Sequence, residues 1–479
     1  MKRLVHSDCL SVLHDSKLVP TGSLGLVYLD PPYGTERLFS AGLRRSRSAL
    51  AGQEPEAFDD HWDEYKAQVK LPVQIELVVK VAEGTGGRRL GTYVRYMAER
   101  LVALERGLSA RASVYVHVSP PVAPYLRLVL DSVLGAQTFK NEVAWKRTHA
   151  HSSSKRFGPV HDTILFYARP GYQWHRPTMP ADPAYFDKHY REVDEDGRRY
   201  QLVTCTGPGD RTGTGAHYEW RGQLPPPGRH WAWKRDEMER LEAVGRLRYS
   251  RNGVPRRVYY ADEHQGVALQ DIWTDIARLD SHSHERIGYD TQKPLALLER
   301  IVASSAPLDG ELVFDGFAGT GTTLLAANAA GLGWIGCDSS LKAAALAIGR
   351  LGEAGIAPGA IDWRGGPSTR AEAEKLAQSD AEAFGVWATG MLGLLPDPKL
   401  HSRDVLFARS ERGARAVAGA RVNMTHLQTL ADAPGATRYA VSVTPAPEHP
   451  EVHSVPVELI AASAARHRAP MGMRGRCGG

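Results

Sequence analysis

The tetrad Asp30-Pro31-Pro32-Tyr33 follows an apolar run at residues 24–29, and its residue types suit chemistry on an amino group. An amino group on a nucleic-acid base is a poor nucleophile because its lone pair is delocalised into the ring. The Asp30 carboxylate and the rigidly held Pro31 carbonyl, both accepting N–H hydrogens, would localise that lone pair toward an incoming methyl group. Tyr33 would stack on a base that has left the duplex. The tetrad alone also fits an ordinary turn after a strand.

A second candidate site is the glycine-rich segment Phe314-Asp315-Gly316-Phe317-Ala318-Gly319-Thr320-Gly321-Thr322-Thr323. A strand, a glycine turn, a helix and then an acid about twenty positions on, here Asp338, form the layout of a nucleotide-binding βαβ unit. Glycines let a cofactor approach the backbone, and the acid can bind ribose hydroxyls. A phosphate-binding P-loop is disfavoured because no Lys follows the last glycine. A dinucleotide site, or a turn that only packs helix on strand, stays open.

Both candidates follow apolar runs that are typical of buried parallel strands. Strands are predicted at residues 24–29, 113–118, 311–314 and 332–337, and helices near 96–108, 125–134, 294–304 and up to 330. Pro294 suits the first turn of the third helix. Alternation of this kind predicts an α/β sheet, in which ligands bind beyond the carboxyl ends of the strands. The Asp30 tetrad lies where such a strand ends, so we expect chemistry there.

The order of these motifs along the chain is more specific than either motif. Asp-Pro-Pro-Tyr, a variable middle, Thr291-Gln292-Lys293-Pro294 and then Phe317-x-Gly319-x-Gly321 closely resemble the β-class DNA amino-methyltransferases over about residues 1–345. The resemblance implies a doubly wound, Rossmann-like sheet in permuted order, S-adenosylmethionine as cofactor and double-stranded DNA as substrate. It implies a catalytic half at 1–144, a target-recognition domain at 145–285, a cofactor-binding half at 286–350 and an appendage at 351–479.

The resemblance also assigns roles to single residues. The base would be bound by Asp30, Pro31, Pro32 and Tyr33. The cofactor would be bound by Asp8, Cys9, Asp30, Thr291, Gln292, Lys293, Asp315, Phe317, Ala318, Gly319, Gly321, Thr322 and Asp338. Among these, Asp338 would bind ribose, Asp8 would lie near adenine, and residues 291–293, at a helix N-terminus, would face the methionine carboxylate. Ser7, Gly34 and Gly316 depart from the family pattern, which affects loop geometry but removes no reactive group.

The Asp form of the tetrad favours adenine N6 as the acceptor, and cytosine N4 stays open because the same chemistry serves either amino group. Methylation of cytosine C5 is disfavoured because it needs a thiolate, typically a Cys after a proline, and no cysteine here follows one. Ser119-Pro120-Pro121 resembles a cytosine-N4 motif, but Val122 follows it instead of an aromatic residue. A catalytically silent DNA-binding regulator, and a methyltransferase of RNA or protein glutamine, are the alternative functions.

The middle of the chain is rich in Arg, His, Gly and aromatic residues. Cationic and short polar side chains suit phosphate contacts, and Arg and Asn can read base edges in the major groove. The residues predicted to contact DNA are Lys146, Arg147, Ser152, Lys155, Arg156, Arg229, Arg251 and Asn252. Each of them alone could equally be a solvated surface residue. The histidines lack metal-ligand spacing, so we predict no metal site.

Composition sets broad limits on the class of protein. The chain has 479 residues, 42% of them hydrophobic and 24% charged, with a formal net charge of +5, a mild bias toward anionic partners. No stretch approaches the ~20 apolar residues of a membrane span. The four cysteines, Cys9, Cys205, Cys337 and Cys477, lie far apart, which argues against disulfides and suits a reducing cytoplasm.

The appendage beyond residue 350 faintly resembles a restriction-nuclease-like module. Such a nuclease needs acidic residues and a Lys close together on a strand, but the expected place holds Ala416-Val417-Ala418-Gly419-Ala420 between Arg415 and Arg421. We therefore predict no cleavage activity, and a degenerate remnant or a packing or dimerisation element. Further partners that the resemblance allows are a second copy of the chain and a cognate restriction endonuclease.

Overall fold

The computed structural model describes most of the chain. The described residues are 1–32, 39–40, 56–58, 65–148, 155, 157–280, 283–287, 289, 291–397, 400, 405–411, 413–433, 437–444 and 446–465. They divide into two compact units, one formed by Met1–His175 and Gln270–Gly479 and the other by Arg176–Leu269. Tyr33, Ser152 and Arg156, which the sequence assigns to base or DNA binding, lie outside the described residues.

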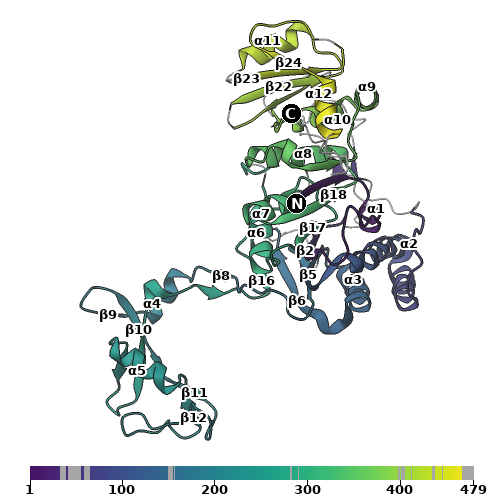
Figure 1. The fold of residues 1–479 in the computed structure, drawn as a ribbon. Helices are drawn as coiled ribbons and strands as arrows, with labels where there is room; N and C mark the ends of the chain where they lie inside the picture. The colour runs from purple at the N-terminus through teal and green to yellow at the C-terminus, as the bar shows by residue number, and fades with distance from the viewer. Residues whose placement is uncertain are drawn as a thin grey trace, which may run out of the picture. The chain divides into compact units, whose positions relative to one another are not determined.

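A nine-stranded sheet forms the centre of the large unit, in the order β16-β6-β7-β5-β2-β17-β18-β1-β19 (Figure 1). The strands are β1 (Lys2–His6), β2 (Leu24–Leu29), β5 (Leu108–Val118), β6 (Phe139–Lys146), β7 (His161–Ala168), β16 (Ile272–Trp273), β17 (Leu312–Asp315), β18 (Gly333–Asp338) and β19 (Asp362–Arg364). All pairs from β5 to β19 are parallel, whereas β7 is antiparallel to both of its neighbours. The central strand β2 is buried along its whole length, as its continuous apolar run predicts.

Helices cover both faces of this sheet (Figure 1). One face carries α1 (Cys9–His14), α2 (Val73–Leu104, with a non-helical Gly87) and α3 (Ala123–Leu130), which form one core with β2 and β5. The other carries α6 (Leu295–Ser304) and α7 (Thr322–Ala329), while α8 (Leu341–Glu353) packs on α7, β1 and β18. Pro294 is the N-cap of α6, one residue before the predicted first turn, because its ψ of 137° is extended.

The connections of β2 and β17 leave the centre of the sheet in opposite directions. From β2 the chain passes through α2 to β5, and from β17 it passes through α7 to β18 on the other side. Because β2 and β17 are parallel neighbours, this reversal opens a crevice at their carboxyl ends, the usual ligand position in such sheets. The predicted doubly wound, Rossmann-like fold with the permuted strand order is confirmed.

The second unit, Arg176–Leu269, has its own small core of Cys205, Trp220, Trp231, Met238, Leu241 and Leu247. Its helices are α4 (Pro183–His189) and α5 (Arg235–Ala243), and its strands are β8 (Thr178–Met179), β9 (Glu192–Val193), β10 (Arg199–Thr204), β11 (Thr206–Pro208), β12 (Arg229–Trp231), β13 (Leu247–Tyr249), β14 (Pro255–Tyr260) and β15 (Val267–Ala268). The unit is narrower than the range 145–285 predicted for target recognition, because β7 and β16 in the flanks of that range pair into the large sheet.

Residues beyond 353 add a five-stranded sheet to the large unit. Its strands run in the order β20 (Leu395–Pro396), β21 (Val405–Arg409), β22 (Ala414–Gly419), β23 (Thr437–Ser442) and β24 (His453–Pro456), antiparallel up to β22 and parallel afterwards. The accompanying helices are α9 (Arg370–Ser379), α10 (Ala381–Gly390), α11 (Met424–Asp432) and α12 (Val457–Ala465). A short pair, β3 (Phe39–Ser40) and β4 (Glu56–Phe58), completes the described strands.

Helix α10 connects this sheet to α8, and two glycines permit the close approach. A Cβ on Gly390 would lie 2.5 Å from the Ala345 carbonyl oxygen of α8, and one on Gly385 would lie 2.7 Å from Leu406 Cβ of β21. The C-terminal segment therefore packs on α8 mainly through α10, and β20 also contacts α8. Within the described ranges, no helix has the length and apolar character that crossing a bilayer requires.

A buried ion pair holds β22 against the segment after β20. Asp397 Oδ2 lies 2.5 Å from Arg415 Nη1, and the Asp397 side chain is only 1% exposed. Arg409, which is half exposed, approaches the other carboxylate oxygen at 3.8 Å. Arg415 thus occupies part of the stretch in which a nuclease would need acidic residues, and its guanidinium neutralises the nearby acid.

Replacing Arg415 with Ala leaves a buried carboxylate without its closest cation. We expect the free energy of unfolding to fall by about 3 kcal/mol, since removal of one partner from a buried pair is strongly destabilising. Thermal denaturation of the full chain measures the effect. Arg409→Ala is the matched control and should cost less than about 1 kcal/mol, because that arginine is exposed. Equal losses in the two variants would contradict this account.

Candidate functional site

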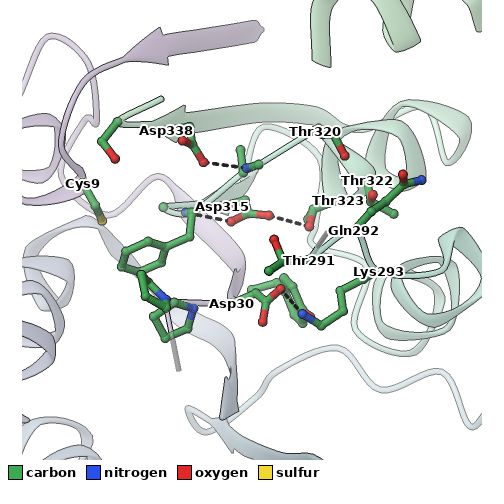
Figure 2. Close-up of a pocket in the computed structure, with 18 of the residues that line it drawn as sticks. Cys9, Asp30, Thr291, Gln292, Lys293, Asp315, Thr320, Thr322, Thr323 and Asp338 are labelled. Atoms are coloured by element: carbon green, nitrogen blue, oxygen red, sulfur yellow. Dashed lines mark hydrogen bonds and ion pairs between the residues drawn. The ribbon is translucent and has the colours of Figure 1, made fainter. Parts of the chain in front are cut away.

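A pocket opens at the carboxyl ends of β2 and β17 and gathers most of the predicted residues from distant parts of the chain (Figure 2). The predicted residues that line it are Asp8, Cys9, Asp30, Pro31, Pro32, Thr291, Gln292, Lys293, Asp315, Phe317, Ala318, Gly319, Thr322 and Asp338. The two candidate motifs of the sequence therefore share one cavity. Their meeting follows from the parallel pairing of β2 with β17, which places Asp315 beside Tyr28 in the register.

Asp30 forms an ion pair with Lys293 inside the pocket (Figure 2). The Lys293 ammonium contacts Asp30 Oδ2, and the two side chains are 9% and 14% exposed. Asp30 directly follows β2, whereas Lys293 precedes α6, so the ion pair joins residues from the two ends of the sequence. The sequence places Lys293 near the cofactor, but its contact with the candidate catalytic acid was not foreseen.

Asp315 is a buried acid, and its hydrogen-bond donors among the described residues carry no charge. Its oxygens accept from the Phe317 amide at 3.0 Å and from the Thr323 hydroxyl at 2.5 Å (Figure 2). Burial raises the pKa of the Asp315 carboxyl to about 7, and the charges of Asp30 and Asp338 add to the rise. The pocket therefore holds an acid whose ionised form would gain from a bound cation.

The glycine-rich turn after β17 is fixed by Asp338 at the end of β18. Asp338 accepts hydrogen bonds from the Gly319 amide at 2.7 Å and from the Ser340 amide at 2.8 Å. Burial raises the pKa of Asp338 as well. Gly321 does not line the pocket: it begins α7 with a φ of 78°, and a Cβ there would lie 2.8 Å from Ala347 Cβ. This glycine serves the turn and the packing of α7 on α8.

Another wall of the pocket is built from α1 and α2. Asp8 caps α1 by accepting from the Leu10 amide at 2.9 Å, and Arg100 Nη2 donates to its second oxygen at 2.5 Å. The Arg100 guanidinium stacks 3.3 Å above the Tyr96 ring, which lies 6.4 Å from the Phe317 ring. Asp8 thus carries its counter-charge within the protein, and the Tyr96 and Phe317 rings, tilted by 44° to each other, give this wall apolar ring surface.

The segment before α6 is braced internally. The Gln292 side chain donates to the Glu285 carbonyl at 2.8 Å and accepts from the Ile287 amide at 3.1 Å. The Glu285 carboxylate accepts from the Leu295 amide at the start of α6, at 2.8 Å. Gln292 and one amide of the helix N-terminus are therefore used by the protein itself. That residues 291–293 face a ligand carboxylate stays a prediction.

Several pocket residues were not selected from the sequence: Tyr28, Tyr96, Tyr289, Leu298, Gly316, Thr320, Thr323 and Ser339. Thr320 and Thr323 lie within the glycine-rich segment, and hydroxyl side chains close to Asp315 in the sequence could have been predicted to line the pocket. Tyr28 precedes Asp30 by two residues, and strand alternation places both side chains on one face. Tyr96 and Tyr289 lie in segments without a motif, and only the folded chain brings them to the pocket.

The residues predicted to contact DNA are scattered over both units. Lys146 and Arg147 are exposed at the end of β6, although Arg147 lies 3.4 Å from Asp162, and Lys155 is exposed. Arg229 donates to the hydroxyl and the carbonyl of Thr206 at 2.8 Å each, which gives it a structural use. Arg251 and Asn252 are exposed at the turn between β13 and β14. No cluster of His, Cys, Asp or Glu among the described residues is arranged to hold a metal ion.

Comparisons with known proteins agree with this geometry. A family model described as DNA methylase, of the N6 and N4 type, matches residues 24–348. The chain is 33% identical over 333 residues to the type II methyltransferase M.EcaI of Enterobacter cloacae, covering 68% of this chain and 64% of that protein. It is 25% identical to the StyLTI Mod subunit, a type III restriction-modification enzyme of Salmonella typhimurium, over 66% of this chain and 48% of that protein. The chain thus spans less than two thirds of either relative.

Solved structures in the comparison include M1.HpyAVI in complex with SAM and the cytosine-N4-specific PvuII DNA methyltransferase. The first is 12% identical, with a TM-score of 0.35, over 73% of this chain and 99% of that one. The second is 12% identical, with a TM-score of 0.33, over 72% of this chain and 85% of that one.

The raised pKa of Asp315 predicts a pH-dependent gain in stability for Asp315→Asn. Between pH 4 and 7 the unfolded chain has lost a proton that folded Asp315 still binds, so this group lowers wild-type stability as the pH rises through that range. The Asp315→Asn variant has no carboxyl at this position, so its stability does not fall in this way as the pH rises. We expect its stability advantage to be near zero at pH 4 and to reach about 1–3 kcal/mol at pH 8, measured by denaturant unfolding. An advantage that shrinks with rising pH would contradict the burial argument.

Proposed function

Because the chain belongs to the DNA methylase family, we propose that it transfers a methyl group from S-adenosylmethionine to an exocyclic amino group of a base in double-stranded DNA. Adenine N6 is the favoured acceptor and cytosine N4 the alternative. The observation that carries the proposal is the meeting of the Asp30 segment and the Asp315 loop in one pocket, at the crevice between β2 and β17.

The charge pattern of the pocket fits S-adenosylmethionine, which carries a sulfonium and an ammonium group. Asp315 is buried and accepts hydrogen bonds from the uncharged Phe317 amide and Thr323 hydroxyl, so a nearby cation would stabilise its ionised form. Asp338 is held by backbone amides at the end of β18, the position at which an acid can accept ribose hydroxyls. Tyr96 and Phe317 offer apolar ring surface to an adenine. When bound, the cofactor supplies an electrophilic methyl group.

The residues of the chain would prepare the amino group for attack. Asp30 and the Pro31 carbonyl accept its two N–H hydrogens, which directs the lone pair out of the ring. The ion pair with Lys293 fixes the orientation of the Asp30 carboxylate before the base arrives, and such preorganisation lowers the barrier without a covalent intermediate. Tyr33 is proposed to stack on the extruded base.

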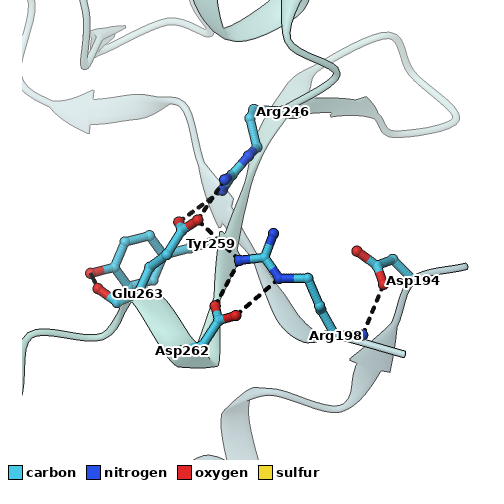
Figure 3. Close-up of polar contacts among 6 residues, drawn as sticks. All are labelled: Asp194, Arg198, Arg246, Tyr259, Asp262 and Glu263. Atoms are coloured by element: carbon cyan, nitrogen blue, oxygen red, sulfur yellow. Dashed lines mark hydrogen bonds and ion pairs between the residues drawn. The ribbon is translucent and has the colours of Figure 1, made fainter. Parts of the chain in front are cut away.

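The unit Arg176–Leu269 is proposed to contribute to target recognition, and its arginines fall into two groups. Arg198 donates to Asp262 at 2.8 and 2.9 Å, and Arg246 donates to Glu263 at 2.5 and 2.8 Å, so these two stabilise the unit itself (Figure 3). Arg251, by contrast, lies exposed at the β13–β14 turn with Asn252. We therefore assign base or phosphate contacts to the turn. A homodimer and a cognate restriction endonuclease stay predictions.

Replacing Asp30 with Ala should lower methyl transfer by at least two orders of magnitude, because it removes the acceptor that localises the lone pair. The measurement is nucleoside mass spectrometry after incubation with PCR-amplified genomic DNA and isotopically labelled cofactor. Label on N6-methyladenine supports the favoured acceptor, and label on N4-methylcytosine supports the alternative. Cofactor affinity, measured by calorimetry, should stay within about threefold. Wild-type activity in this variant would refute the mechanism.

Replacing Arg251 with Ala should weaken DNA binding about tenfold and reduce the salt dependence by about one ion, as expected for loss of one phosphate or base contact. Fluorescence anisotropy at several salt concentrations measures both. Arg246→Ala is the matched control: it removes the same charge from the same unit but should lower stability more than affinity, since Arg246 pairs with Glu263. If both variants bind DNA equally weakly, the turn has no special role.

A further inference from the structure

A row of buried polar side chains leads from the pocket across the sheet. The Tyr28 hydroxyl of β2 lies 2.8 Å from His117 Nδ1 of β5, and His117 Nε2 lies 3.2 Å from Asp162 Oδ2 of β7. The three residues are 2%, 0% and 2% exposed. Tyr28 lines the pocket beside Asp30, whereas His117 and Asp162 lie behind it. Burying polar groups in an apolar sheet lowers stability unless they are hydrogen-bonded, and the hydrogen bonds within this row satisfy that requirement.

The hydrogen bonds fix the direction in which a proton could move. An ionised Asp162 can only accept, so His117 Nε2 carries the hydrogen that it donates to Asp162. His117 Nδ1 then has a lone pair and accepts the Tyr28 hydroxyl hydrogen. The order of groups is hydroxyl, imidazole and carboxylate, in which the imidazole can take a proton through the hydroxyl while the carboxylate stabilises the resulting charge.

We propose that His117 is the acceptor of the proton that the exocyclic amino group loses during methylation, with Tyr28 as relay and Asp162 as counter-charge. The inference rests on the proposed function. The amino lone pair forms the new N–C bond, and the pair of the broken C–S bond stays on sulfur. Once the N–C bond has formed, one N–H hydrogen leaves its first acceptor, Asp30 or the Pro31 carbonyl, and passes as the surplus proton to the Tyr28 oxygen while the Tyr28 hydrogen passes to His117 Nδ1. The products are the methylated base, a neutral thioether and an imidazolium paired with Asp162.

The other acids and bases of the pocket are less suited to this task. Asp30 is ion-paired with Lys293, so protonating it would break a largely buried pair. Burial raises the pKa of Tyr28 well above its ordinary value, which keeps the hydroxyl protonated and limits it to a relay. Burial also acts to raise the pKa of Asp162, but the hydrogen bond from His117 and the charges of Arg147 and Lys293 act against it, and that pKa is lowered. Asp162 therefore stays ionised to receive an imidazolium.

The surroundings of His117 set the expected pH dependence. Tyr28 faces it from β2, Asp162 from β7, and the Trp145 ring of β6 meets it edge-on at 5.6 Å. Other charged groups act on the two partners of His117. Asp30 and Asp315 act on Tyr28, and Arg147 and Lys293 act on Asp162. A protonated His117 cannot accept a proton, so the transfer rate should fall at low pH. Replacing Asp162 removes the counter-charge for the imidazolium that the transfer produces, so the fall in rate should move to lower pH.

The test is the single-turnover rate of methyl transfer by the full chain between pH 5.5 and 9, with PCR-amplified genomic DNA and labelled S-adenosylmethionine. Tyr28→Phe keeps the ring and removes the relay. His117→Asn keeps an acceptor for Tyr28 but cannot take a proton. We expect both to slow transfer at least tenfold and to lose the acid limb of the profile, with cofactor and DNA affinities within about twofold. In Asp162→Asn the acid limb of the pH–rate profile should move to a pH about one unit lower.

Tyr115→Phe is the matched control, because it removes another buried tyrosine hydroxyl of the sheet, one that contacts Ser305 at 2.7 Å. It should keep the wild-type rate and profile. The proposal is overturned if Tyr28→Phe retains the wild-type rate, or if the variants are slow but the acid limb stays unmoved in all three, as a purely structural brace would predict. Absence of transfer by the wild-type chain would instead refute the proposed function, and this inference with it.

Discussion

The parallel pairing of β2 with β17 is the contact on which the site depends. It joins a strand from the start of the chain to one almost three hundred residues later, and it aligns the ends of both strands at one edge. Three acids of the pocket are positioned from that edge: Asp30 after β2, Asp315 at the end of β17 and Asp338 at the end of the next strand. A shift in this register would separate the two motifs, and neither could act alone.

The pocket concentrates negative charge but neutralises only part of it internally. Asp8 is paired with Arg100 and Asp30 with Lys293, whereas within the described part of the chain the donors to Asp315 are all uncharged. This division separates two tasks. The paired acids are held in fixed orientations, which suits groups that position a base or a loop, while the acid without a cationic donor gains most from a positively charged ligand.

The sequence predicted those parts of the site that depend on local backbone chemistry. Proline-fixed and glycine-rich turns after apolar strands are visible as residue types, and Asp30, Asp315 and Asp338 were selected on that basis. The contact between Lys293 and Asp30, the brace formed by Gln292 and the Tyr28–His117–Asp162 row were not predicted, because each joins residues that are adjacent only in the folded sheet. The compact second unit covers residues 176–269, and the flanks of the range 145–285 hold two further strands of the large sheet, β7 and β16, which the irregular composition concealed. That this range recognises the target stays a prediction.

The close packing of α10 on α8 has a consequence for how the chain can be divided. Residues along all sides of α8 are buried, including Lys342, Leu346 and Gly349, and the side that faces away from the nine-stranded sheet is covered by α10 and Leu394. A fragment ending near residue 350 would expose that side to water, and with it a cationic side chain whose acidic neighbours, Asp380 and Glu382, had been removed. The C-terminal sheet is thus less an exchangeable module than the outermost layer of a shared core, and recombination or trimming at this boundary should produce aggregation-prone chains.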